Sequence, residues 1–110
     1  MDSRLIYSAT QEITRKIFWP KVTDMEWVYF GTKGEVIKEI VMENIKTHFS
    51  DDNLYVVRQR NNSFQTSKDN SLEAITDLLG VEDFSLWNQP LDRVIQFNRI
   101  GVLRRGERNS

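Results

Sequence analysis

The most constraining feature of the chain is a set of apolar residues that recur at three- and four-residue steps between Thr32 and Phe49. This spacing places them on one face of an α-helix, and a strand would not keep it over so long a stretch. The residues that share the face are Val36, Ile37, Ile40, Val41, Ile45 and Phe49. Thr32 followed by Glu35 fits a capping box at a helix start. The sequence therefore predicts a helix over residues 32–49 that buries this face against a sheet.

Shorter patterns of both kinds fill the rest of the chain. Two further helices are predicted, one over about residues 9–18 and one from Asn70 to Gly80, where the glycine ends the helix in a left-handed conformation. Strands are predicted at 25–30, 54–60, 63–67, 84–87, 93–99 and 100–104, with Gly101 at a bulge or tight bend. This order predicts one α+β domain over residues 1–110, in which an antiparallel or mixed sheet has about three helices packed on one side.

Composition excludes several classes of protein. The chain has no cysteine, so disulfides and thiolate metal sites are excluded, and core burial alone must stabilise the fold. No apolar run approaches the roughly 20 residues that a membrane-spanning helix needs. The N-terminal stretch lacks the uninterrupted apolar segment of a secretory signal. We therefore expect a cytoplasmic protein without a membrane partner.

Charge is distributed unevenly along a chain whose formal net charge is −1. Six acidic residues and no lysine or arginine occur from Asp69 to Asp92, whereas five arginines and one glutamate follow from Arg93 onward. One interpretation is that the two stretches face each other and neutralise locally. The other is that one of them binds a partner of opposite charge.

Residues that could support catalysis or metal binding are few. The single histidine, His48, lies near a predicted helix C-terminus, where it can complement the helix dipole. Asp51 and Asp52 match no calcium-binding loop, and the turn at 31–36 has neither a dinucleotide nor a P-loop fingerprint. We therefore expect no enzyme activity, no cofactor and no metal.

Arginines on predicted strands suggest a nucleic-acid-binding alternative. Arg58 and Arg60 are two residues apart, so both point to one face of a strand. The residues that would form a basic strip are Arg58, Arg60, Arg99, Arg104 and Arg105. The sequence pI of about 5.8 argues against such a surface.

Acidic residues beside an aromatic one suggest instead a surface that binds another protein. The predicted partner-binding residues are Asp77, Glu82 and Asp83, with Trp87 as an exposed anchor at the edge. The competing interpretation is that Glu82 and Asp83 pair internally with Arg93 or Arg99, and that Trp87 lies in the core.

A function follows from this profile as an expectation. A small domain without catalytic groups, with an acidic segment and an aromatic anchor, is typical of a protein-binding module. We expect an immunity- or antitoxin-type inhibitor that covers the basic active site of a toxin, such as a nuclease, with carboxylates. The alternative is a nucleic-acid-binding accessory protein that uses the arginines.

Overall fold

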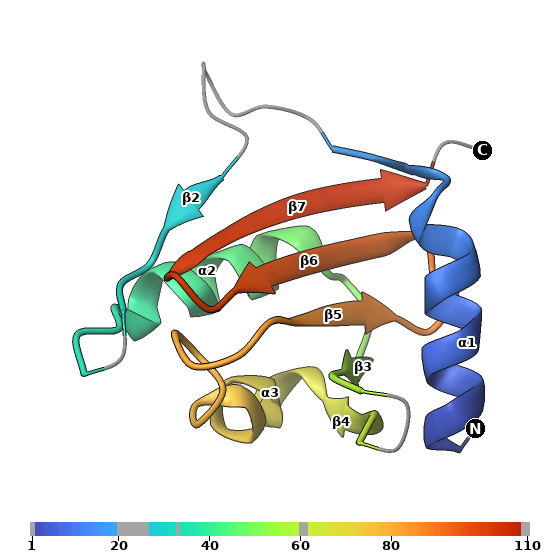
Figure 1. The fold of residues 1–110 in the computed structure, drawn as a ribbon, viewed down its shortest axis with the longest axis horizontal. Helices are drawn as coiled ribbons and strands as arrows, with labels where there is room; N and C mark the ends of the chain where they lie inside the picture. The colour runs from blue at the N-terminus through green and yellow to red at the C-terminus, as the bar shows by residue number, and fades with distance from the viewer. Residues whose placement is uncertain (1, 20–26, 33, 60–61, 109–110) are drawn as a thin grey trace.

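The computed structural model describes residues 2–19, 27–32, 34–59 and 62–108 (Figure 1). Its elements are α1 Ser3–Thr14, β1 Ile17–Phe18, β2 Val28–Tyr29, α2 Lys38–His48, β3 Asn53–Val57, β4 Phe64–Ser67, α3 Lys68–Ile75, β5 Phe84–Asn88, β6 Arg93–Asn98 and β7 Val102–Arg108. All seven strands belong to one antiparallel sheet. The predicted α+β class with three helices is confirmed.

The sheet is built around its last three strands. Its order is β1-β7-β6-β5-β3-β4, and β2 also pairs with β7. Both short strands lie along β7, with Ile17 opposite Arg108 in β1 and Val28 opposite Leu103 in β2. The N-terminal segment and the C-terminal strand are therefore held together in the sheet (Figure 1).

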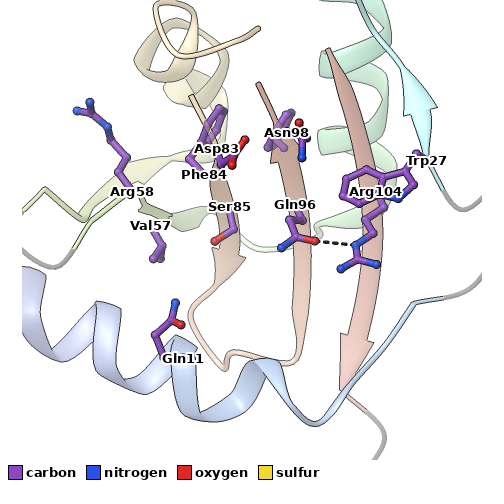
Figure 2. Close-up of a pocket in the computed structure, with 11 residues that line it drawn as sticks. Gln11, Trp27, Val57, Arg58, Asp83, Phe84, Ser85, Gln96, Asn98 and Arg104 are labelled. Atoms are coloured by element: carbon purple, nitrogen blue, oxygen red, sulfur yellow. Dashed lines mark hydrogen bonds between the residues drawn. The ribbon is translucent and has the colours of Figure 1, made fainter. Parts of the chain in front are cut away.

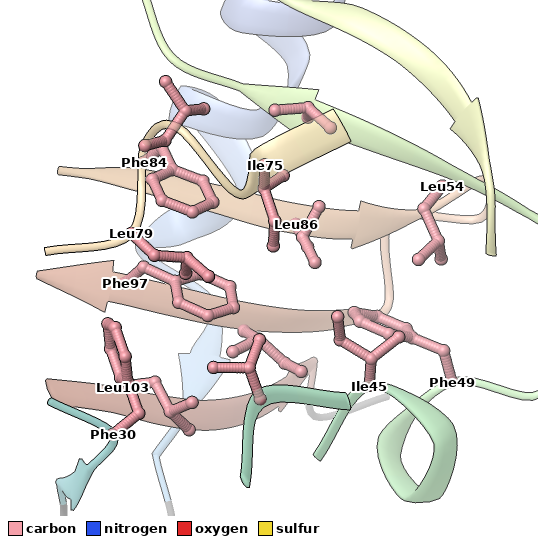
Figure 3. Packing of buried hydrophobic residues seen from close by; sticks show 14 residues of the cluster. Phe30, Ile45, Phe49, Leu54, Ile75, Leu79, Phe84, Leu86, Phe97 and Leu103 are labelled. Atoms are coloured by element: carbon pink, nitrogen blue, oxygen red, sulfur yellow. The ribbon is translucent and has the colours of Figure 1, made fainter. Parts of the chain in front are cut away.

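One face of the sheet is covered by α2 and α3 (Figure 3). Val41 and Ile45 of α2 and Ile75 of α3 are fully buried there against alternate residues of the strands. The strand residues of this cluster are Leu54, Val56, Phe84, Leu86, Ile95, Phe97 and Leu103. The ring of Phe97 stacks on that of Phe84, with centroids 4.6 Å apart. This face holds the larger of the two clusters.

The other face of the sheet packs against α1, so the predicted placement of all three helices on one side is wrong. Ile6 of α1 is buried with Tyr55, Val57, Trp87 and other residues that alternate with the first cluster. The physical reason is visible in β3, where four consecutive apolar residues are buried. A strand with apolar side chains on both faces needs cover on both, and α1 supplies the second layer.

The helix of residues 32–49 begins later than its apolar pattern predicts. Lys38 is its first residue, and Ile37 at the N-cap position has no side-chain cap. Thr32 instead accepts a hydrogen bond from the Glu35 amide within a turn, at 2.9 Å. Because Ile37 precedes the helix, its side chain is 44% exposed, contrary to its predicted burial. Val41 and Ile45 are buried as predicted.

The first helix also differs from its prediction. It begins at Ser3, because the Asp2 carboxylate caps it by accepting from the Leu5 amide at 3.0 Å. It ends at Thr14, and the chain continues into β1 where a helix was expected. Residues 25 and 26 of one predicted strand, and Arg60 and Asn61, lie outside the described residues.

Gly80 and Gly101, which the sequence placed at turns, both have positive φ angles. The predicted helix end at Gly80 is wrong, because α3 ends at Ile75 with Thr76 as its C-cap. Gly80 lies in the turn that follows, with φ 73°, and Gly101 in the β6–β7 turn has φ 96°. Both angles lie in the left-handed region that glycine adopts without strain. The third helix begins at Lys68, because the Ser67 hydroxyl caps it by accepting from the Asn70 amide at 3.2 Å.

Candidate functional site

Trp87, the predicted exposed anchor, lies in the core. Its side chain is 2% exposed and packs in the cluster under α1. The indole Nε1 donates a hydrogen bond to Ser85 Oγ at 2.9 Å, which satisfies its polar atom inside the protein. The prediction failed because β5 is a central strand that is covered on both faces. Trp87 is therefore not part of any surface site in this conformation.

Glu82 is neutralised within the fold. Arg58 forms a bidentate salt bridge with it, in which Nε donates to Oε2 at 3.0 Å and Nη2 donates to Oε1 at 2.7 Å. The hydrogen bonds that Arg58 donates to the Glu82 carboxylate raise the pKa of the guanidinium above its ordinary value. Internal pairing of Glu82 is thus found, with Arg58 in place of the expected Arg93 or Arg99. Because the two charges neutralise each other, Glu82 does not contribute free charge to the predicted protein-binding surface, and Arg58 does not contribute it to the predicted basic strip.

Asp83 has a structural bond as well. Its Oδ1 accepts from the backbone amide of Arg99 at 2.8 Å and so fixes the β6–β7 turn. The sequence suggested an ion pair with the guanidinium of Arg93 or Arg99, whereas Asp83 bonds the backbone of Arg99. The residue is otherwise exposed, and it lines a pocket on the α1 side of the sheet.

Asp77 belongs to a different surface, together with two acids of α3. Asp69, Glu73 and Asp77 follow one another at four-residue steps, and all three are exposed. Within the described part of the chain, none of these carboxylates has an ion-pair or hydrogen-bond partner. We call these three residues the acidic stripe. Asp69 lies in the first turn of α3, where a carboxylate complements the helix dipole, whereas Asp77 follows the helix, which ends at Ile75.

A groove with apolar floor residues runs beside the acidic stripe, between α2 and α3. Two adjoining hollows of about 530 Å³ and 510 Å³ share Lys38 and Leu72. Met42 of α2 and Leu72 of α3 supply apolar surface and are half-buried against the core. The charged residues that line the hollows are Glu39, Glu43, Glu73 and Asp77, with Lys38 and Lys46. Four carboxylates and two lysines give this α2–α3 groove a negative balance.

The arginines predicted to form one basic strip are separated. Arg104 and Arg105 are neighbours on β7, so they point to opposite faces of the sheet. Arg58 is held by Glu82, and Arg99 lies in the β6–β7 turn. Arg60 is outside the described residues. The described arginines therefore do not form the continuous surface that phosphate recognition along a strand requires.

Arg104 is instead part of the pocket on the α1 side, shown in Figure 2. Its guanidinium carbon lies 4.0 Å from the ring centroid of Trp19 and 4.6 Å from that of Trp27. These distances are typical of cation–π contacts. Its Nε donates to Gln96 Oε1 at 2.6 Å. The aromatic and amide contacts fix the arginine over the sheet.

The same pocket brings together residues from distant parts of the sequence. It measures about 350 Å³, and its lining includes Arg58, Asp83 and Arg104 of the predicted sites. The polar residues that the sequence analysis missed are Gln11, Ser85, Gln96 and Asn98. A signal for three of them exists in the strands, where they occupy positions of the α1 face that alternate with buried apolar residues.

His48 is placed for structure. Its Nε2 bonds the carbonyl oxygen of Gly106 at 2.9 Å. Burial lowers its pKa, and the nearby Arg93 and Arg105 lower it further, against the raising effect of the Gly106 bond. In the described residues, no group of three or more His, Asp or Glu side chains is arranged to hold a metal ion.

Comparison with known proteins finds no match of this chain to a family model, to a curated protein or to a solved structure. No helix in the described part of the chain has the length and apolar character to cross a membrane.

Proposed function

We propose that this protein is a binding module that docks on a basic partner protein through the α2–α3 groove and the acidic stripe. The partner we favour is a toxin whose basic active site, such as that of a nuclease, is covered on binding. Asp77, which the sequence indicated as a partner-binding residue, lies on this surface. The proposal replaces Glu82 and Trp87, which are engaged inside the fold, with Glu73 and Asp69.

One observation carries the proposal: exposed, unpaired carboxylates of the described chain flank a hollow with apolar floor residues. Protein interfaces combine an apolar centre with a polar rim, and complementary charge supplies fast association and selectivity. Met42 and Leu72 would form the centre, and the carboxylates of the groove would form the rim. Val81, 46% exposed, extends the apolar surface at the end near Asp77.

The nucleic-acid-binding alternative has weaker support. The described arginines face different sides of the sheet, and one of them is paired with Glu82. We expect no binding of a single-stranded RNA of about 20 nucleotides at physiological salt, measured by fluorescence anisotropy. Binding that weakens steeply as salt rises would favour the alternative.

The test of the proposal reverses charge on the groove. The Glu73→Lys/Asp77→Lys variant is compared with Glu12→Lys/Glu107→Lys, which changes net charge equally at exposed positions on α1 and β7. Each is used, beside the unaltered protein, to capture proteins from cells of its source. A protein held by the unaltered chain and by the control, but lost by the groove variant, is then purified. Its affinity is measured by calorimetry.

The expected partner is a basic protein whose affinity falls roughly tenfold or more in the groove variant and changes little in the control. The partner's nucleic-acid cleavage should be inhibited by the unaltered protein in a one-to-one complex. Equal affinities of the two double variants, both folded by circular dichroism, would contradict the proposed surface.

A further inference from the structure

Strand β4 forms the end of the sheet opposite β1, and in the described part of the chain β3 is the strand that pairs with it (Figure 1). Its other side is an edge of the sheet. Natural sheet edges are commonly guarded by charged residues, prolines or bulges, which prevent pairing with another chain. The residues Phe64–Ser67 carry no charge and include no proline, and their register with β3 runs without a bulge. This edge therefore lacks all three guards.

The backbone hydrogen bonds show which residues of β4 face the open edge. In an antiparallel pair, residues that bond the partner strand alternate with residues whose amide and carbonyl groups point away from it. The Lys68 amide donates to the Asp52 carbonyl oxygen at 2.7 Å, and this pair continues the register of β4 with β3. The even-numbered residues of β4 therefore bond β3. Gln65 and Ser67, together with Ser63 directly before the strand, point their backbone groups outward.

Two of these outward groups are already bonded inside the protein. The Ser63 amide donates to Ser3 Oγ at 2.8 Å. The Ser67 carbonyl belongs to the N-cap of α3, where it accepts the first hydrogen bond of the helix. The groups that remain are the Ser63 carbonyl, both backbone groups of Gln65 and the Ser67 amide. Among the described residues, no strand lies opposite them.

The remaining groups are complementary to those of a second copy of the chain. When two β4 strands run antiparallel about a two-fold axis at Gln65, the Gln65 amide of each copy faces the Gln65 carbonyl of the other. Each Ser67 amide then faces the Ser63 carbonyl of the other copy. The pairing does not use the Ser63 amide or the Ser67 carbonyl, which are the two groups that the fold already satisfies. The edge is thus complementary to itself in this register.

The same register also matches the side chains. Phe64, which is 37% exposed, lies opposite Thr66 of the second copy, and an aromatic residue opposite a β-branched one stabilises a sheet. Lys68 follows the end of β4, so the lysines of the two copies lie at opposite ends of the paired strands. The net charge of −1 gives two copies little long-range repulsion. Neither side chains nor charge oppose the pairing.

We propose that this protein forms a dimer in which the β4 strands of two copies pair antiparallel with Gln65 at the two-fold axis, so that the two sheets become continuous. The paired strands are short, so we expect a dissociation constant between about 1 μM and 1 mM. The α2–α3 groove lies on a face of the sheet, and each copy keeps its own groove. The inference therefore does not rest on the proposed function.

Sedimentation equilibrium of the full chain up to about 1 mM tests the dimer. The average mass should rise from that of a monomer towards that of a dimer. Gln65→Pro removes the central amide and leaves the bonds to β3, so it should weaken association roughly tenfold or more. Gln65→Ala keeps the amide and, as the matched control, should associate like the unaltered protein. A protein that stays monomeric, or equal association of the two variants, would overturn the proposal and leave the edge open to a strand of another protein.

Two charged variants test the register without removing a backbone hydrogen bond. Gln65→Lys and Gln65→Glu each set like charges opposite each other across the two-fold axis, so each alone should associate roughly threefold more weakly. An equal mixture should recover the association of the unaltered protein, because lysine then faces glutamate. Gln89→Lys and Gln89→Glu, in the exposed β5–β6 turn, are the matched controls and should associate normally both alone and mixed. A mixture of the Gln65 variants that associates no better than either variant alone would contradict the two-fold axis at Gln65.

Discussion

The imidazole Nε2 of His48, in the last turn of α2, lies 2.9 Å from the carbonyl oxygen of Gly106 in β7. A backbone carbonyl has no proton to give, so Nε2 carries the hydrogen and donates it. The bond joins the helix layer to the strand that holds both N-terminal strands. Because burial lowers the pKa of the ring below its ordinary value of 6.5, the folded protein keeps His48 neutral at pH 7.

The stability of the protein should therefore fall as pH decreases below about 6.5. In this window the unfolded chain binds a proton at His48 and the folded chain, with its lowered pKa, does not. The free energy of unfolding, measured by urea titration at intervals between pH 7 and pH 5, should decline. The sequence contains one histidine, so no other imidazole contributes.

His48→Gln is the matching variant for this pH dependence. The glutamine amide can reach the Gly106 carbonyl as a donor and does not titrate. We expect its unfolding free energy to change less between pH 6.5 and pH 5 than that of the unaltered protein. If the unfolding free energy declined equally in the variant and in the unaltered protein, the pH dependence would arise from titratable groups other than His48.

Breaking the Arg58–Glu82 pair should lower stability modestly and non-additively. Both side chains are partly exposed, so we expect a loss of about 1 kcal/mol from either Arg58→Met or Glu82→Gln, near the upper end for pairs of this kind. The double variant should lose less than the sum of the two losses, because the second substitution removes a contact that is already broken. Additive losses in thermal or urea unfolding would mean that the two residues act independently.

Ile37, which precedes α2, and Ile45, which lies in its C-terminal half, should differ in their contribution to stability. Ile45→Ala removes a fully buried side chain and should cost about 2–5 kcal/mol. Ile37→Ala removes one that is 44% exposed and should cost much less, within about 1 kcal/mol. Comparable losses from both in chemical denaturation would mean that the helix buries Ile37 as its sequence pattern suggests.

Gly106→Ala should destabilise the pairing of β1 with β7. A Cβ atom at this position would lie 2.5 Å from Cγ2 of Ile17 and 2.7 Å from the ring of Trp19. Both side chains must move, and overpacking of this kind costs about 1–3 kcal/mol. Because Trp19 also packs on Arg104, its displacement should change tryptophan fluorescence as well as the unfolding midpoint. A midpoint and spectrum equal to those of the unaltered protein would show that the rings move aside freely.

Local patterns predicted the elements whose causes are local. Turns are predicted at Gly80 and Gly101 from these residues and their neighbours, and both glycines have the left-handed conformation, although α3 already ends at Ile75. The apolar period correctly placed Val41 and Ile45 in the core. The same period misplaced Ile37, because the backbone amide of that residue bonds the carbonyl oxygen of Phe30 in a preceding segment.

The candidate sites were predicted less well, because long-range packing decides them. Leu86 and Trp87 are adjacent and point to opposite faces, so burial of both depends on helices from distant parts of the chain. Glu82 forms its ion pair with Arg58, which lies 24 residues earlier in the sequence and is brought close by the pairing of β3 with β5. Nothing in the local sequence distinguishes that partner from Arg93 or Arg99.

The pairing of β7 with β1, β2 and β6 also sets an order of assembly. The hairpin of β3 and β4, with α3, can form while β7 is still absent, since its contacts are close in sequence. In the described part of the chain, both N-terminal strands pair with β7, so these pairings form only once the last strand of the sheet is available. During synthesis on the ribosome, the edge of β6 therefore stays open until β7 emerges, and that interval is when the chain is most prone to associate with another.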